Sequence, residues 1–302
     1  MLNDPRCPVC DAWSRVTRRI ANWGEMRECV SCGLVFSKPM ALPGGSAVDF
    51  FNRAYQGRLS GEMRHFHQRL EMAGYIEKVG NAFPAGQWQE TFVQVLQEKL
   101  GRGARILDIG CGTGLFMKRL QKSGFQPLGL DVAEAVVRVL RGEGYQVWHG
   151  GVATYPRDWP EPDACTLNLV LHHSPDPVGF LNSIRERFPK SGLLVSDIRA
   201  SKPLYPFWAP PRHLTIWTAR SLDAALGKAG YHTEQVYEFP VEIGSLGDSI
   251  GHQVFLGLPP VLRRMNLLRL YYLAKPVLTV LPWAVFRALD MNGNVCAVAE
   301  PL

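Results

Sequence analysis

The central part of the chain alternates short apolar runs with amphipathic stretches, which is the pattern of repeated strand–helix units. Strands are expected at residues 105–109, 126–131, 146–148, 164–170, 193–198, 232–239 and 294–299, and helices at 115–122, 133–141, from 177 onward and 218–229. Because strands joined through helices run parallel, we expect an α/β fold in which a doubly wound sheet is covered on both faces.

Polar residues mark where the later helices begin. Asp176 followed by Pro177 is a typical helix start, and Thr218 is the expected cap of a helix that Gly230 closes. Before the alternating region, residues 39–45 form a link rich in Pro and Gly. We expect helices at 62–78 and 90–100, separated by breaker residues at 80–86. No internal repeat is present.

Length and composition limit the number of domains. The chain has 302 residues, of which 46% are hydrophobic and 20% charged, so it is an ordinary globular protein of one large domain with an appendage or of two medium ones. We divide it into a small N-terminal unit (1–40), a linker with helices (41–100) and a main domain (101–302). The formal net charge of +6 permits an anionic partner without requiring one.

Four of the seven cysteines form two close pairs near the N-terminus. Cys7 and Cys10 are separated from Cys29 and Cys32 by eighteen residues, a C-x2-C spacing in which each pair can bind one side of a tetrahedral ion. We predict a structural Zn²⁺ ribbon, since four cysteines leave no open position for catalysis. An odd cysteine count and the lack of a signal-like start favour a reducing, cytoplasmic compartment over a secreted disulfide framework.

A glycine-rich loop directly follows the strand at 105–109. Gly110, Gly112 and Gly114 alternate along it, Asp108 precedes it, and Asp131 ends the next strand twenty-three residues later. In an open α/β sheet this is the position of a nucleotide site. Glycines allow close approach of a ligand to the backbone, and an acid there can accept hydrogen bonds from both ribose hydroxyls. A nicotinamide cofactor fits less well, because its fingerprint has the spacing G-x-G-x-x-G.

The loop resembles the first motif of the Rossmann-like S-adenosylmethionine-dependent methyltransferases. The resemblance is close over about 101–200 and looser to residue 302, and it includes further stretches in order: 129–131, 145–151 and 169–177. It implies a mostly parallel, seven-stranded sheet. It further implies that Asp108 and the loop Gly110-Cys111-Gly112-Thr113-Gly114 bind the methionine part of S-adenosyl-L-methionine and that Asp131 binds the ribose. Val132 would flank the adenine, with Gly151 in the 149–152 stretch on its other side, and Asn168 would lie near the methionine end.

Three histidines are candidates for the chemistry. Methyl transfer to a hydroxyl or a carbon acid needs a base, and His titrates in the required range. We expect His173 to be the base, because by the resemblance it matches the histidine that recurs in relatives, whereas His172 replaces an acid often found there. His213 is in the loop after the fifth strand, which should face the substrate, and the nearby aromatic residues could line an organic acceptor: Tyr205, Phe207, Trp208 and Trp217. The alternative for each histidine is a structural role in capping or packing, and for Trp217 it is packing.

The segment 259–290 is apolar, interrupted by prolines and basic. Its longest uncharged run, 276–286, is too short to span a membrane. We expect a helical insertion at 258–291, before the last strand. It either covers the substrate or makes a peripheral contact with the inner face of the membrane, which would give access to a lipid-linked acceptor.

The combination of zinc ribbon, linker and this core resembles bacterial methyltransferases of sugar, glycan or secondary-metabolite pathways, which implies a methyltransferase with a small-molecule acceptor: a sugar, a glycan precursor or a secondary metabolite. Two alternatives stay open. One is a zinc-containing rRNA methyltransferase, which the modest positive charge disfavours as it does any nucleic-acid partner. The other is a non-catalytic binding module that keeps the cofactor. The acceptor atom and the oligomeric state do not follow from the sequence.

Overall fold

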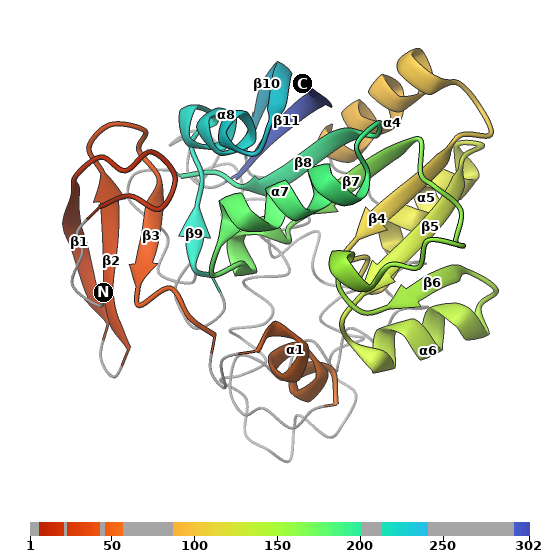
Figure 1. Ribbon diagram of the computed structural model, residues 1–302, viewed down its shortest axis with the longest axis horizontal. Coiled ribbons are helices and arrows are strands. Elements are labelled where there is room, and N and C mark those ends of the chain that lie inside the picture. Colours follow the sequence, from red (N-terminus) through yellow and green to blue (C-terminus); the bar gives the residue numbers. More distant parts are fainter. Residues whose placement is uncertain (1–5, 21–22, 43–45, 57–86, 201–212, 241–292) are drawn as a thin grey trace, which may run out of the picture.

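The computed structural model describes residues 6–20, 23–42, 46–56, 87–200, 213–240 and 293–302. These residues form a seven-stranded central sheet and a four-stranded N-terminal sheet, which lie side by side (Figure 1).

The central sheet has the strand order β10-β11-β8-β7-β4-β5-β6. Its strands are β4 (Arg105–Ile109), β5 (Gln126–Asp131), β6 (Gln146–His149), β7 (Ala164–Asn168), β8 (Gly192–Ile198), β10 (Tyr231–Pro240) and β11 (Gly293–Pro301). Neighbours from β8 to β6 pair in parallel, whereas β11 pairs antiparallel with both β8 and β10. The predicted mostly parallel, seven-stranded sheet is confirmed.

Helices connect these strands and cover the sheet on both faces. They are α4 (Gln87–Leu100), α5 (Leu115–Lys122), α6 (Glu134–Gly142), α7 (Pro177–Arg187) and α8 (Ala219–Lys228). The two expected caps are present: Asp176 accepts a hydrogen bond from the N–H of Gly179 at 2.9 Å, and Thr218 accepts one from Ser221 at 3.1 Å. These bonds satisfy N–H groups that a helix start leaves unpaired.

The core divides according to the alternation of side chains along each strand. Leu107 and Ile109 of β4 pack with α7 and α8, whereas Ile106 packs on the opposite face with α4 and α5. Strand β11 repeats this division, because Val295 and Ala297 join the first cluster and Cys296 joins the second. The sheet is therefore buried on both faces, as the apolar strand sequences predict.

One expected strand is shorter than predicted. Strand β7 ends at Asn168 rather than at residue 170, because Leu169 has a positive φ of 59° and the chain then forms a short 3-10 turn at Leu171–His173. Val170 lies against the glycine loop, where a Cβ on Gly110 would lie 2.6 Å from its Cγ2. The turn thus places the histidine segment directly beyond the edge of the sheet.

The N-terminal sheet has the order β1-β2-β3-β9. It combines β1 (Ser14–Ile20), β2 (Gly24–Cys29) and β3 (Val35–Lys38) with β9 (Thr215–Ile216), a two-residue strand from the main domain. The apolar run Leu34-Val35-Phe36 is the sequence signal for β3. Helix α1 (Ala47–Tyr55) follows this sheet and was not predicted.

Several expectations lie outside the described residues. These are the helix at 62–78, the insertion at 258–291 with its membrane contact over 259–290, and the aromatic residues Tyr205, Phe207 and Trp208. Within the described segments, no helix combines the length and the apolar character that crossing a membrane would require.

Candidate active site at the carboxyl edge of the sheet

The carboxyl ends of β4, β5, β7 and β8 bring most of the predicted site residues to one edge. The order reverses at β4, whose two neighbours are β5 and β7, so the glycine loop leaves the sheet at its topological switch point. Ligands bind at such points because the two flanking connections diverge and leave a crevice.

Asp108 is held inside this edge. Its Oδ1 accepts hydrogen bonds from the Thr166 hydroxyl at 2.9 Å and from Nδ2 of Asn168 at 2.7 Å. Burial raises the pKa of the Asp108 carboxyl to about 7, and the nearby charge of Asp131 adds to this, whereas the two hydrogen bonds oppose it. A carboxyl that is buried in this way gains most from a cationic neighbour.

The glycine loop has a backbone that only glycine adopts readily. Gly110, Gly112 and Gly114 have φ values of 73°, 51° and 72°. A Cβ on Gly114 would come within 2.5 Å of the Leu140 side chain, and one on Gly112 would be 3.5 Å from the Tyr55 hydroxyl. The loop therefore keeps its shape only without side chains at these positions.

Asp131 ends β5 beside this loop. Its two carboxylate oxygens accept hydrogen bonds from the N–H groups of Gly112 at 2.9 Å and Ala133 at 2.8 Å. Burial raises the pKa of Asp131, and these N–H groups oppose the shift. Each oxygen keeps a further acceptor position, which two vicinal hydroxyls of a ribose would match.

Helix α1 contacts both the segment that follows Asp131 and the ring of His173. Asn52 donates from Nδ2 to the Val132 carbonyl at 3.2 Å and accepts from the Glu134 N–H at 2.8 Å. Phe51, one residue earlier, has its ring 5.0 Å from that of His173 in an edge-on arrangement. Sequence reasoning missed this helix. The Ser46-x-x-Asp49 pattern was the available signal, since Ser46 caps α1 by accepting from the N–H of Asp49.

The structure also locates three further residues that were predicted to bind the cofactor: Gly151, Cys111 and Asn168. Gly151 follows β6, and a Cβ built on it would meet no atom within 4 Å. The side chain of Cys111 is buried in the cluster that includes Met117 and Val136, so it could meet a ligand only through its backbone. Among the described residues, Oδ1 of Asn168 is one of few buried side-chain oxygens without a hydrogen-bond partner.

The three predicted histidines lie together. The ring centroids of His172 and His173 are 3.9 Å apart, those of His172 and His213 are 4.8 Å apart, and those of His173 and His213 are 5.8 Å apart. His172 and His213 are buried, and His173 is half-buried. The N–H of Leu214 also donates to the His172 carbonyl at 2.8 Å, which fixes the two segments together.

An acid that sequence reasoning missed completes this cluster. Asp197, near the end of β8, is fully buried, and its Oδ1 lies 2.7 Å from Nδ1 of His172. Its position near the carboxyl end of a predicted central strand was the available signal. Trp217 is different from what we expected: it is fully buried in the core that contains α7 and α8, so it packs there and does not face an acceptor.

The four cysteines converge at the N-terminal sheet. Their sulfur atoms all lie within 4.8 Å of one another, with Cys7 and Cys32 at 3.7 Å and Cys10 and Cys29 at 3.3 Å. Tetrahedral Zn²⁺ with bonds of about 2.3 Å to sulfur requires sulfur separations of about 3.8 Å, so the cluster fits this ion. The hydrogen bond with Cys32 lowers the pKa of Cys7 to about 5, while the same contact and burial raise the pKa of Cys32, so the pair favours a thiolate at Cys7.

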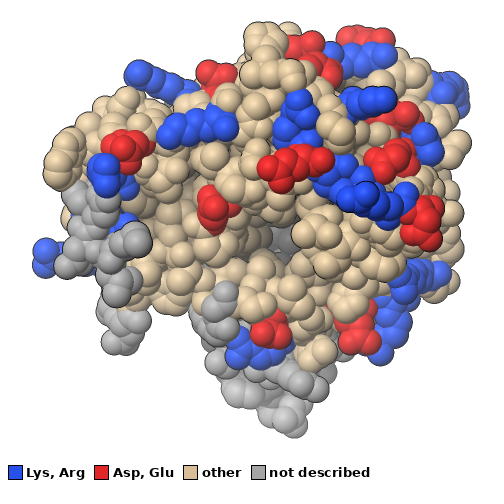
Figure 2. Space-filling view, in the orientation of Figure 1, with Lys and Arg blue, Asp and Glu red and all other residues tan. Residues whose placement is uncertain are grey.

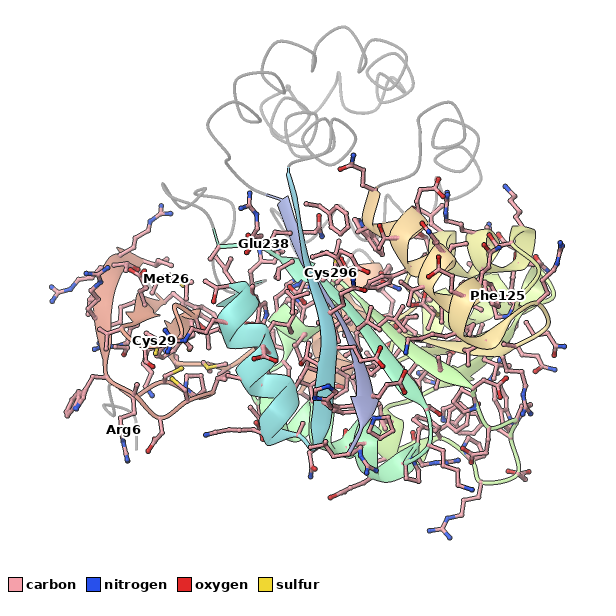
Figure 3. All side chains as sticks on the ribbon, turned by 90° about the horizontal axis from the view of Figure 1, so that it is seen from above. Arg6, Met26, Cys29, Phe125, Glu238 and Cys296 are labelled. Atoms are coloured by element: carbon pink, nitrogen blue, oxygen red, sulfur yellow. The ribbon has the colours of Figure 1, made fainter. Side chains whose placement is uncertain are left out.

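Backbone N–H groups support the ligands. Val9 donates to the sulfur of Cys7 at 3.4 Å, and Ser31 and Cys32 donate to that of Cys29 at 3.4 Å. Viewed from above, Cys29 lies on the side of the N-terminal sheet that faces α8 (Figure 3).

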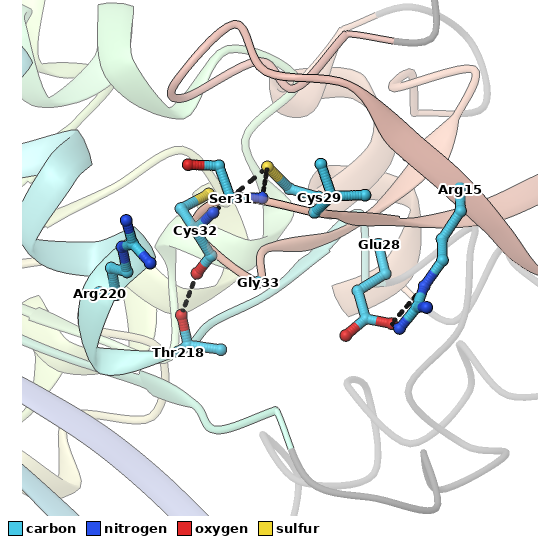
Figure 4. A pocket seen from close by; sticks show the side chains of 9 residues that line it. Arg15, Glu28, Cys29, Ser31, Cys32, Gly33, Thr218 and Arg220 are labelled. Atoms are coloured by element: carbon cyan, nitrogen blue, oxygen red, sulfur yellow. Dashed lines mark hydrogen bonds and ion pairs between the residues drawn. The ribbon is translucent and has the colours of Figure 1, made fainter.

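The ribbon is bonded to the main domain at its second cysteine pair. Thr218, the cap of α8, donates from its hydroxyl to the Cys32 carbonyl at 2.6 Å (Figure 4). The Ser37 N–H donates to the Leu214 carbonyl at 2.8 Å, and β3 pairs with β9. A small cavity between ribbon and helix is lined by Arg15, Glu28, Cys29, Val30, Ser31, Cys32, Gly33, Thr218 and Arg220 (Figure 4).

Comparison with protein families gives a match of residues 81–236 to the model described as a methyltransferase domain. The chain is 33% identical over 135 residues to an indolepyruvate C-methyltransferase of Streptomyces griseus, covering 40% of this chain and 41% of that protein. It is 31% identical over 107 residues to a ubiquinone biosynthesis O-methyltransferase of Xylella fastidiosa, covering 32% and 42%. The chain thus spans about two fifths of the length of these curated relatives.

Solved structures show the same fold at low identity. A putative methyltransferase in complex with the Trm112 methyltransferase activator of Haloferax volcanii gives a TM-score of 0.52 at 14% identity, covering 78% of this chain and 96% of that one. Phosphoethanolamine N-methyltransferase 2 of Haemonchus contortus, in complex with S-adenosyl-L-methionine, gives 0.51 at 16% identity, covering 78% and 60%.

Proposed function

Because the chain belongs to the methyltransferase-domain family, we propose that it transfers a methyl group from S-adenosyl-L-methionine to a small-molecule acceptor. The observation that carries this is the convergence of Asp108, Asp131 and Asn168 around a glycine loop at the switch point of the sheet. When bound, the cofactor supplies a methyl group on a sulfonium centre, which makes that carbon electrophilic.

The residues at the edge fit such a donor. The buried carboxyl of Asp108 favours a positive charge, and Oδ1 of Asn168 offers an acceptor for an ammonium N–H. Asp131 matches the ribose hydroxyls, and the half-buried Val132 flanks this position. The loop from Gly110 to Gly114 gives the donor access to the backbone.

The acceptor side is the histidine cluster. Orientation is the first requirement of an in-line transfer, and a base is needed when the acceptor is a hydroxyl or a carbon acid. Of the two curated relatives, one is a C-methyltransferase and the other an O-methyltransferase. Both fit an acceptor that loses a proton, so we propose an O–H or acidic C–H acceptor among sugars, glycan precursors, including lipid-linked ones, and secondary metabolites.

Charge on the surface supports a small acceptor over RNA. On the face drawn in Figure 2, Lys and Arg lie interspersed with Asp and Glu, not in one continuous basic patch. An RNA-binding surface gains its affinity from contiguous phosphate contacts.

The test is formation of S-adenosylhomocysteine by the zinc-loaded full chain. The acceptor panel contains nucleotide sugars, phenols, indole-3-pyruvate and total RNA. We expect turnover with one of the small acceptors and none with RNA. Turnover with RNA alone would support the rRNA methyltransferase, and tight cofactor binding without turnover on any acceptor would support the non-catalytic module.

A further inference from the structure

The carboxylate of Asp197 is enclosed by hydrogen-bond donors near the end of β8. Its Oδ2 lies 3.1 Å from the backbone N–H of His172, and its Oδ1 lies 2.7 Å from Nδ1 of the same residue and 2.7 Å from the N–H of Ile198. The side chains of Asp197 and His172 are 0% and 3% exposed. A buried carboxylate with two backbone donors is fixed in direction, and so is the imidazole that it holds.

This contact determines which nitrogen of His172 carries the proton. With both carboxylate oxygens already accepting backbone N–H groups, the bond to Nδ1 is best made by an N–H on the imidazole. Neutral His172 is then the Nδ1–H tautomer, and its Nε2 keeps a lone pair that can accept a proton. If Nε2 is protonated, the resulting imidazolium is stabilised by the adjacent carboxylate.

The surroundings of His172 connect it to the acceptor side. Its ring lies next to that of half-buried His173 and that of His213, and its segment directly follows β7, which carries Asn168. In the described part of the chain, the only group of three or more His, Cys, Asp and Glu side chains whose ligand atoms converge as a metal site is the four cysteines. The histidines and Asp197 are thus better suited to proton transfer than to metal binding.

We propose that Asp197 is a positioning residue of the methyl transfer and that His172, which it orients, accepts the proton lost by the acceptor. This inference rests on the proposed function. The acceptor's oxygen or carbon forms a bond to the methyl carbon while the sulfur–methyl bond breaks and its electron pair stays on sulfur. The acceptor proton ends on Nε2 of His172, and its bonding pair stays with the acceptor. The acceptor must therefore be an O–H or C–H acid.

The first test needs no acceptor. The full chain, labelled with ¹⁵N-histidine and bound to S-adenosylhomocysteine, is studied by NMR, with His172→Asn identifying the signals of His172. We expect this ring to be the Nδ1–H tautomer and to lose that state in Asp197→Asn. Asp223→Asn, an acid-to-amide change on the exposed side of α8, is the matched control and leaves the ring unchanged. An Nε2–H ring, or one that Asp197→Asn does not alter, overturns the proposal.

The second test measures turnover with indole-3-pyruvate and with catechol. His172→Asn retains an N–H that can donate to Asp197 but removes Nε2, so we expect kcat to fall by about 10² to 10⁴ with KM nearly unchanged. Asp197→Asn should show a loss of similar size. Unchanged kcat in His172→Asn would exclude this histidine as the base.

These measurements distinguish failure of the proposed methyl transfer from failure of the role assigned to Asp197. If the proposed function is wrong, the wild-type chain either does not bind S-adenosylhomocysteine or binds it without turning over any acceptor, whatever the tautomer of His172. If only the assignment to Asp197 is wrong, S-adenosylhomocysteine binds and turnover persists, while the variants at 172 and 197 behave like the Asp223→Asn control. Binding of S-adenosylhomocysteine by each variant also shows that it has folded.

Discussion

Individual residues at the sheet edge combine burial with unused hydrogen-bonding capacity. Asp108 is nearly inaccessible to solvent, and its side-chain donors among the described residues are the neutral groups of Thr166 and Asn168. Burial, the largest cause, raises its pKa to about 7. In the cofactor-free protein this residue therefore keeps its proton over a range in which an unfolded chain would have lost it.

Because the pKa of Asp108 is raised in the folded protein, the contribution of this residue to stability decreases as pH rises. The stability that Asp108 contributes is fully present below its unfolded pKa near 4 and is lost as pH rises through about 7. A cationic ligand favours the ionised carboxylate of Asp108, so its binding should release the proton from this group. We therefore expect S-adenosyl-L-methionine to release close to one proton on binding at pH 6 and much less at pH 8, measured by calorimetry in buffers of different ionisation enthalpy.

The matched variant is Asp108→Asn, which should remove most of this proton release and flatten the pH dependence of affinity. S-adenosylhomocysteine, which lacks the sulfonium charge, should release fewer protons than the donor. Equal proton release from the wild type and from Asp108→Asn would contradict the assignment of Asp108 to the cationic part of the cofactor.

At the scale of elements, the ribbon and the main domain share a sheet. The strand β9 begins two residues after His213 and pairs with β3, and the intervening Leu214 is hydrogen-bonded both to Ser37 of the ribbon and to His172. Folding of the zinc-binding unit is coupled to metal binding, because a small unit of this kind has little core of its own.

Zinc removal should thus loosen the segment that carries His213. We expect a chelator to increase amide hydrogen exchange at 35–38 and at 214–217 in the full chain, with β4 and β5 unaffected and protection restored by added Zn²⁺. Cys10→Ser should give the same pattern without a chelator. Unchanged exchange at 214–217 after complete zinc loss would show that the ribbon does not support this strand.

The sequence predicted the elements whose formation depends on local pattern. Strands β4 and β5 and helix α5 have the expected limits, and Asp176 and Thr218 cap helices as expected. Strand β1 was not predicted because most of its residues are exposed, so it has no apolar alternation, and β9 was not predicted because two residues carry no periodicity. The contact between Asp197 and His172 depends on tertiary packing of residues twenty-five positions apart, which no local pattern encodes.

At the scale of the whole molecule, the proposed function divides the sheet edge into two sides. The glycine loop, Asp131 and α1 would form the donor side, while the turn after β7, β8 and the segment before β9 form the histidine side. Both sides meet at the switch point beside β4 and β7, where a donor and an acceptor can be brought into line. The N-terminal ribbon contacts the histidine side through the pairing of β3 with β9.

Binding of the adenosyl donor at this edge of the sheet through Asp131 can be measured by calorimetric titration of the zinc-loaded chain with S-adenosylhomocysteine. We predict binding at one site per chain, its loss in Asp131→Ala, and retention in the exposed control Asp223→Asn. Equal affinity of the wild type and Asp131→Ala, or no binding to the wild type, would show that Asp131 does not hold the donor at this edge.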